Sequence, residues 1–411
     1  MRYALALLAA AVIACGSTSS RPATPVPTTL SEASDPALAA RVDAALDAAV
    51  REQRIVGGVV LVARDGRLVY HRAAGLADRE HQRPMREDAI FRIASMTKPL
   101  VAVTTLALVD SGVVELDDPV TKFLTGFTPK LADGSAPPIA IRQLLTHSGG
   151  LDYVLNEPPG GPYHRAGVSD GLDAPGRTWA DNQERLVSAP LRTAPGVAFH
   201  YSISIDVLGE AIAKAASAPL PDLVARTVTQ PLGMSDTGFR VTDRSRLVAQ
   251  YANQASDAPQ VMTDGIAVPL GDRAVTFSPS RIFDPASYPS GGAGAVSTAR
   301  DYLRFLEAVR TSAIGLRHDT HASLFREQLA GADPAELGPG VTFGFASSIV
   351  VDPAKADSPV SPDTLTWGGA YGSSWWIDPR ARVSVVILTN TAFEGMVGRL
   401  VKDVQHAVYG R

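Results

Sequence analysis

Phe91-Arg92-Ile93-Ala94-Ser95-Met96-Thr97-Lys98-Pro99-Leu100 is the stretch of sequence that decides the fold. If a helix begins at Ser95, Lys98 lies three positions further on, and both side chains share one face. A serine hydroxyl is a weak nucleophile at neutral pH and needs an adjacent base. A lysine amine can act as that base only when it is uncharged, which burial favours. Because the apolar residues 101–109 supply burial, the stretch predicts a nucleophile and its base at the start of a buried helix.

Five further motifs follow in order along the chain. They are Leu144-Leu-Thr-His-Ser-Gly-Gly-Leu151, Phe199-His-Tyr-Ser202, Pro231-Leu-Gly-Met234, Ser290-Gly-Gly-Ala-Gly294 and Trp367-Gly-Gly369. Together with residues 91–98, this series resembles the serine β-lactamase and penicillin-binding superfamily. The branch it resembles holds class C β-lactamases, D-Ala-D-Ala carboxypeptidases and family VIII carboxylesterases. The resemblance runs from about residue 37 to the C-terminus. It implies an α/β (α+β) fold, with an antiparallel sheet flanked by helices and an inserted helical domain.

The resemblance also implies roles for individual residues. Tyr201 matches the family's tyrosine, whose phenolic oxygen shares proton transfer with the lysine beside the nucleophile. The backbone N–H groups of Ser95 and Ala370 become the expected oxyanion hole, which binds the negative oxygen that forms during acyl transfer. We expect no cofactor and no metal in this reaction.

Two positions depart from the family pattern. The usual Tyr-x-Asn has Ile203 in place of the asparagine, and Ile203 cannot hydrogen-bond a substrate amide. Trp367, with Gly368 and Gly369, occupies the position of the family's Lys-Thr-Gly. The tryptophan offers only an indole N–H where relatives use a cation to hold a substrate carboxylate. We therefore place all four residues at the substrate site, with the glycines allowing close approach to the substrate, and expect neutral, apolar esters there.

The favoured interpretation is a serine hydrolase that cleaves small neutral esters through an acyl-enzyme on Ser95. One alternative is a D-amino-acid peptidase (DD-carboxypeptidase) or a weak class C-like β-lactamase. Another is a non-catalytic envelope protein that binds ligands on the same scaffold. The net charge of −4 gives no basic face that would suggest nucleic acid as a partner.

Two other residues, Ser169 and His147, are of types that could be taken for catalytic residues. Ser169 lies in Gly167-Val168-Ser169-Asp170-Gly171, which fits Gly-x-Ser-x-Gly, yet no strand precedes it, so we assign it to a flexible lid. His147 lies in a segment that relatives carry as a structural turn near the cleft.

The N-terminus reads as an export signal. Arg2 precedes an apolar run that ends at Cys15, and the sequence around this cysteine resembles a bacterial lipobox. We expect a signal peptide at 1–14 and a membrane-anchored lipoprotein of the bacterial cell envelope, lipidated at Cys15; an ordinary cleaved signal is the alternative. A Ser/Thr/Pro-rich linker should occupy 15–36, and the hydrolase domain 37–411.

Apolar patterns place the main elements of that domain. Asp35-Pro36 predicts the start of an amphipathic helix, and Asp65-Gly66 predicts a hairpin between two strands. Residues 374–377 and 383–388 read as a second strand pair, and one apolar face from Met396 to Val408 as the last helix. We therefore expect a sheet built from about 37–105 and 295–411, with a helical and loop insertion at about 106–294.

Overall fold

The computed structural model describes residues 30–253 and 258–410. Its main feature is one nine-stranded sheet in which β2 (Gly57–Arg64) and β15 (Val383–Thr389), from opposite ends of the chain, pair antiparallel at the centre. On one side of this pair lie β3 (Arg67–Asp78), β1 (Ser31–Glu32) and β4 (Arg83–Pro84); on the other lie β14 (Ser373–Asp378), β13 (Thr364–Gly369), β12 (Ser348–Val350) and β11 (Val341–Phe343). The predicted antiparallel sheet with flanking helices is confirmed.

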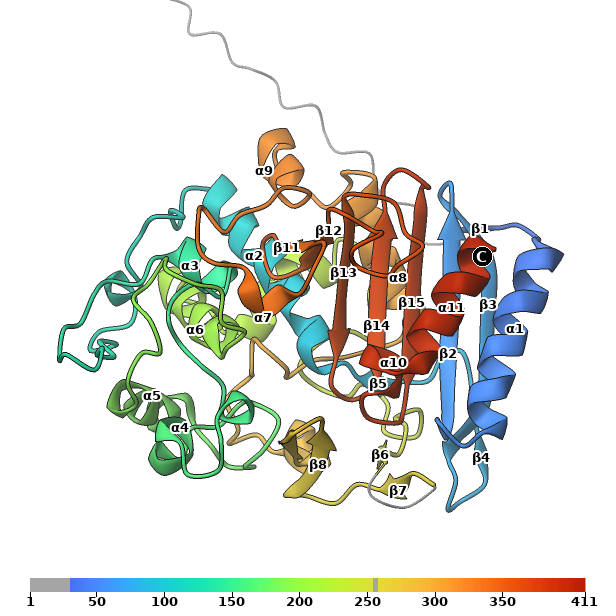
Figure 1. Cartoon of the computed structure of the whole chain (residues 1–411), viewed down its shortest axis with the longest axis horizontal. Coiled ribbons are helices and arrows are strands. Elements are labelled where there is room, and N and C mark those ends of the chain that lie inside the picture. The colour runs from blue at the N-terminus through green and yellow to red at the C-terminus, as the bar shows by residue number, and fades with distance from the viewer. Residues whose placement is uncertain (1–29, 254–257, 411) are drawn as a thin grey trace, which may run out of the picture.

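Helices cover both faces of the sheet because its central strands are apolar on both sides (Figure 1). Val60 and Val62 face α1 (Pro36–Arg51) and α11 (Arg399–Tyr409) in one core. Val59 and Leu61, which alternate with them, belong to the other core with α8 (Ala299–Arg310). The predicted cap of α1 is present, since the Asp35 carboxylate accepts the Leu38 N–H at 3.0 Å.

Most other helices lie beyond the β11–β13 side of the sheet (Figure 1). The central one is α2 (Thr97–Asp110), whose side chains are nearly all buried. Around it and in the connecting loops are α3 (Ile141–Leu145), α4 (Pro162–Ala166), α5 (Trp179–Ser188), α6 (Ser204–Ala215) and α7 (Leu220–Val224). The strands of the main sheet all fall within 31–84 and 341–389.

The smaller elements hold the loops near α2. A short ladder joins β5 (Phe91–Arg92) to β10 (Val296–Ser297). Two hairpins, β6 (Tyr251–Ala252) with β7 (Gln260–Val261) and β8 (Ile266–Leu270) with β9 (Arg273–Phe277), give structure to the long segment after residue 251. The helix α9 (His318–Ser323) follows α8.

Two details correct the sequence-based boundaries. The predicted linker 15–36 ends inside the fold, because Ser31 and Glu32 form β1, which pairs in parallel with β3. The predicted last helix is divided at Gly398 into α10 (Glu394–Val397) and α11, and Val397 is exposed rather than buried. Gly398 is extended, and a Cβ atom at this position would collide with the Glu394 side chain.

Cys15 and the predicted signal peptide lie outside the described residues. Among the residues that are described, no helix combines the length and apolar character that crossing a bilayer requires.

Candidate active site

Ser95 lies in a single 3₁₀ turn, η1 (Ala94–Met96), that leads directly into α2. The regular helix therefore begins two residues later than the sequence predicts. The turn is tightly held: the Thr97 hydroxyl donates to the Ala94 carbonyl at 2.7 Å, and the Tyr302 hydroxyl donates to the Met96 carbonyl at 2.8 Å. Ala94 has φ 41°, a left-handed conformation that costs energy for a residue with a side chain. These contacts fix the direction in which the half-buried Ser95 hydroxyl points.

The structure brings Ser95, Lys98 and Tyr201 together. The Lys98 amine donates to the Ser95 hydroxyl oxygen at 3.0 Å, and the Tyr201 hydroxyl donates to the same oxygen at 2.7 Å. The Lys98 amine also donates to the Gly292 carbonyl at 2.9 Å. Since these distances are those of normal hydrogen bonds, a proton can pass directly between the three side chains.

Burial controls the charge of Lys98. Its side chain is fully buried, and burial lowers its pKa to about 7, while the negative charges of Asp206 and Asp170 oppose this shift. The Lys98 amine also lies 4.7 Å from the centre of the Tyr201 ring, and this contact favours the protonated form. A substantial fraction of Lys98 is therefore uncharged at neutral pH, as a base must be.

Tyr201 is held by its neighbours on several sides. Asn156 donates to the Tyr201 carbonyl at 2.7 Å, and the rings of Tyr153, His147 and Trp367 lie within 5.3 Å of the phenol ring, centre to centre. Burial raises the pKa of Tyr201, and the hydrogen bond to Ser95 lowers it in turn. Tyr201 is therefore protonated at neutral pH and can donate its proton. It does not accept a proton on its own, without Lys98 taking part in the transfer.

Gly369 explains how the predicted oxyanion hole can form. A Cβ atom at Gly369 would lie 2.1 Å from the Ile93 carbonyl oxygen, so only glycine lets the end of β13 approach the Ser95 turn. Ala370 follows at once. Within the described residues, the backbone N–H groups of Ser95 and Ala370 donate to no protein acceptor. Both amides are free to bind a substrate oxygen.

The two glycines after Trp367 nevertheless act differently from the sequence-based expectation. The place of a Gly368 side chain is filled by Met396, 2.6 Å from the ideal Cβ position, and that of Gly369 by Ile93. The glycines therefore let β13 pack against the protein itself, and the structure does not support their expected close approach to the substrate.

Ile203 also departs from its expected role. Its side chain has no exposed surface and packs in the main core at the start of α6. An apolar side chain at this position is taken into the core because it has no polar group to satisfy at the cleft. Trp367, by contrast, is only partly buried and lies against Tyr201.

Ser169 and His147 are both buried. The Ser169 hydroxyl donates to Asp173 at 2.5 Å, and its backbone N–H donates to Asn182, so this serine holds a loop together and does not lie in an exposed lid. The His147 Nδ1 accepts the Ser202 N–H at 3.1 Å. Burial, aided by the Lys98 charge, holds the pKa of His147 well below its usual value, so its ring is neutral.

Sequence reasoning missed the acidic group beside Lys98. Asp206, on the first turn of α6, is fully buried, and burial raises its pKa while Ser290 and the Lys98 charge lower it. Asp170 is buried as well and accepts the N–H groups of Val154 and Leu155. The sequence carried one signal for Asp206. An aspartate among the apolar residues that start a buried helix is expected to need a polar or charged partner.

No group of three or more potential metal ligands gathers anywhere in residues 30–253 and 258–410.

Comparisons with known proteins show the family to which the chain belongs. The family model described as Beta-lactamase matches residues 42–408. Esterase EstB of Burkholderia gladioli is 48% identical over 377 residues, which cover 91% of this chain and 96% of EstB. The solved structure of EstCE1, described as a hydrolase with promiscuous acyltransferase activity, is 42% identical, with a TM-score of 0.87, and covers 91% of this chain and 99% of its own. A penicillin-binding protein homologue from Pyrococcus abyssi, 19% identical with a TM-score of 0.70, covers 90% of this chain and 77% of its own and shares the fold. The chain therefore belongs to the beta-lactamase family, within the superfamily of serine β-lactamases, penicillin-binding proteins and family VIII esterases.

Proposed function

We propose that this protein is a serine ester hydrolase in which Ser95 forms the acyl-enzyme and Lys98 and Tyr201 transfer the protons. The observation that carries the proposal is the hydroxyl oxygen of Ser95, which accepts hydrogen bonds from both Lys98 and Tyr201. Relatives support it: EstB is named an esterase and EstCE1 a hydrolase, and each matches nine-tenths of the chain.

The reaction follows from the geometry in two halves. The Ser95 oxygen attacks the ester carbonyl carbon and gives its proton to the neutral Lys98 amine, while the carbonyl oxygen becomes negative against the N–H groups of Ser95 and Ala370. The carbon–oxygen bond of the ester then breaks, and the departing alkoxide takes a proton from Lys98 by way of Tyr201. In the second half, water attacks the acyl group, loses a proton to the same pair and releases a carboxylic acid, which restores Ser95.

The acid limb of the pH profile is expected to report Lys98. The amine must be uncharged to accept the Ser95 proton, so kcat/KM should be constant above the Lys98 pKa of about 7 and fall about tenfold per pH unit below it. Because the Asp206 charge raises that pKa, Asp206→Asn should move the acid limb to lower pH. The measurement is kcat/KM for p-nitrophenyl butyrate from pH 5 to 9.

Asp319→Asn, a change on the exposed surface of α9, is the matched control and should leave the acid limb in place. An Asp206→Asn profile whose acid limb stays at the wild-type pH would show that Asp206 does not set the lysine's charge.

We propose neutral esters as the substrates because aromatic side chains line the place where relatives hold an anion. Trp367 lies 5.3 Å from the Tyr201 ring and 5.4 Å from Phe343, centre to centre. Its indole N–H is buried and has no hydrogen-bond partner within the described part of the chain. A single neutral donor among aromatic rings favours an uncharged acyl or alcohol group over a carboxylate.

Trp367→Lys should therefore change the substrate preference. A lysine here adds a charge-assisted contact of about 1.5 to 3 kcal/mol, so the ratio of kcat/KM for p-nitrophenyl hemisuccinate to that for p-nitrophenyl butyrate should rise about tenfold to a hundredfold. Trp367→Met, which removes the ring but adds no charge, is the control and should leave the ratio near the wild-type value. A ratio that rises equally in both variants would contradict the electrostatic explanation.

A D-amino-acid peptidase or β-lactamase remains the alternative within the same family. Rates for nitrocefin and for a D-Ala-D-Ala peptide, compared with those for short p-nitrophenyl esters, decide between them. The proposal expects the esters to be the faster substrates by kcat/KM, and faster lactam or peptide turnover would overturn it.

We also propose that the protein is exported and held to the cell envelope by lipid on Cys15. The support is the apolar run that ends at this cysteine and the Ser/Thr/Pro-rich segment after it. In cell fractionation, Cys15→Ser should move the protein from the membrane fraction to the soluble fraction, because two acyl chains anchor stably whereas a cleaved soluble domain does not bind the bilayer. A variant that stays with the membrane would exclude a lipid anchor at this residue.

A further inference from the structure

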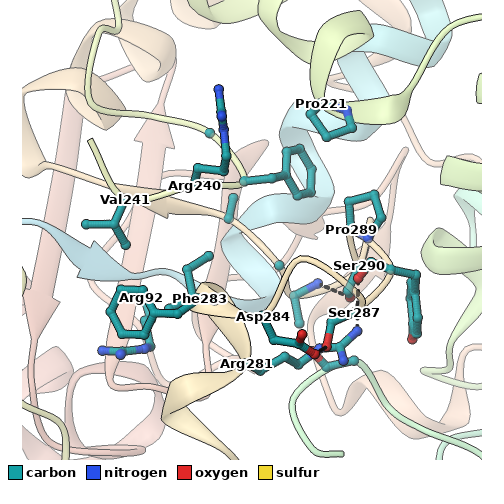
Figure 2. Close-up of a pocket in the computed structure, with 18 of the residues that line it drawn as sticks. Arg92, Pro221, Arg240, Val241, Arg281, Phe283, Asp284, Ser287, Pro289 and Ser290 are labelled. Atoms are coloured by element: carbon teal, nitrogen blue, oxygen red, sulfur yellow. Dashed lines mark hydrogen bonds between the residues drawn. The ribbon is translucent and has the colours of Figure 1, made fainter. Parts of the chain in front are cut away.

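A cavity of about 780 Å³ lies outside the catalytic cluster, between the loop after α7 and the segment 278–295 (Figure 2). Neither Ser95, Lys98 nor Tyr201 lines it. Its wall includes Ser290, Ala293 and Gly294, and the neighbouring Gly292 carbonyl accepts the Lys98 amine. The segment 290–294 therefore contacts the catalytic lysine and also lines the cavity.

Arginines give this cavity its charge. Arg92, Arg240, Arg244 and Arg281 line it, against the two carboxylates of Asp222 and Asp284. The guanidinium of Arg281 already has protein partners, because it donates hydrogen bonds to the carbonyls of Gly171, Ala174 and Tyr288. The carboxylate of Asp284 also has protein partners, since it accepts hydrogen bonds from the Ser287 hydroxyl and from the Ala286 N–H.

The other three arginines have no carboxylate partner among the described residues. Arg92 is only 8% exposed and donates to two carbonyls, those of Pro279 and Val248. Arg244 lies over the Phe283 ring, 4.2 Å from its centre, and the Arg92 guanidinium lies 5.8 Å from the same ring. Arg240 is exposed and forms no hydrogen bond or ion pair within the described chain. Only Arg92 of the three is buried, and Asp264 acts on it only at longer range than an ion pair, so a negative ligand in the cavity would stabilise its charge.

Apolar side chains complete the wall of the cavity. Phe283 is 36% exposed, and Phe239, Val241 and Ile282 lie in the same lining. Figure 2 shows Arg92 and Phe283 together on one side of the cavity, with Arg240 and Val241 on the segment beside them. An inorganic anion would leave these apolar surfaces uncovered, whereas a hydrocarbon chain would bury them.

We propose that this cavity is a second binding site, for amphiphilic carboxylate anions. The carboxylate pairs with the guanidinium groups of Arg92, Arg240 and Arg244, and the hydrocarbon part lies against Phe239, Val241 and Phe283. The proposed ester hydrolysis releases acids of this class, although the site is argued independently of that reaction.

Calorimetric titration of the full chain with sodium octanoate tests the proposal. Octanoate is expected to bind saturably, and 1-octanol, which has the same chain without the charge, at least tenfold more weakly. Arg240→Gln combined with Arg244→Gln should weaken octanoate binding about tenfold. Both side chains are exposed, so the fold does not depend on them.

Arg326→Gln is the matched control, because Arg326 is also exposed, forms no side-chain ion pair in the described chain and lies outside the cavity. It should leave octanoate binding within twofold of wild type, and ester turnover should stay within twofold in both variants. The proposal is overturned if octanoate shows no saturable binding, if octanol binds equally well, if the double variant binds like wild type, or if inorganic phosphate binds more tightly than octanoate.

Discussion

Ser95→Ala should lower kcat/KM for p-nitrophenyl butyrate by about 10⁴-fold or more, to the level set by binding and the oxyanion hole alone. The reason is chemical: without the Ser95 oxygen no covalent intermediate can form, and neither Lys98 nor Tyr201 has a proton to remove from the protein. The same change should abolish covalent labelling by a fluorophosphonate, measured as intact mass. Since Ser95 lies in a turn that the Thr97 and Tyr302 hydroxyls hold, loss of its own hydroxyl should leave the fold intact.

Ser169→Ala is the matched control, because Ser169 fits the other hydrolase motif. Its hydroxyl bonds to Asp173 and accepts the Gly171 N–H, so the change should cost about 1 to 3 kcal/mol of unfolding free energy and leave ester turnover within a few-fold of wild type. Full activity in Ser95→Ala would exclude Ser95 as the nucleophile, and loss of labelling only in Ser169→Ala would assign that role to Ser169.

The central strands β2, β3, β14 and β15 were predictable because their signals are local, whereas β1, β4, β11 and β12 were not predicted. Asp65-Gly66 between two β-prone runs fixes the β2–β3 hairpin, and Asp35-Pro36 marks the start of α1. The pairing of β2 with β15 follows once both ends of the chain are seen to carry apolar strands, since each needs a partner. The meeting of Ser95, Lys98 and Tyr201 was predictable only from the order of motifs, because Tyr201 lies 103 positions after Lys98 and 106 positions after Ser95.

The features that the sequence could not show arise where segments far apart in the chain pack against each other and bury their side chains. Asp206 acts on Lys98 only because α6 packs beside α2, and no spacing rule relates the two. Ile203 was placed at the substrate by its motif, but a helix start can turn such a side chain into the core. The glycines after Trp367 were assigned to the substrate, yet the atoms that require them belong to Ile93 and Met396. The arginine cavity combines residues from several loops that share no local pattern.

Lys98→Met should produce an enzyme that is inactive and yet well folded. Methionine fills a similar volume in the core but cannot accept the Ser95 proton, so kcat/KM for p-nitrophenyl butyrate should fall about 10³-fold, the usual contribution of a general base. Tyr201 cannot replace the lysine, since its raised pKa keeps the phenol protonated. Fluorophosphonate labelling should slow in parallel, because it needs the same proton transfer.

The stability of Lys98→Met separates this role from a structural one. At pH 5.5, below its lowered pKa, the wild type must hold Lys98 as an ammonium in the core, so replacing it should raise the unfolding free energy by about 1 to 4 kcal/mol. Asp206 then loses its cation, and its folded-state pKa rises further above the unfolded value. A group of this kind stabilises the fold at low pH and loses that contribution as pH rises through its folded pKa, so the gain should shrink between pH 5.5 and 8. Urea unfolding at both pH values measures this, and a variant that is less stable than wild type at pH 5.5 would mean that Lys98 is needed to hold the fold, so that its lost activity no longer identifies a base.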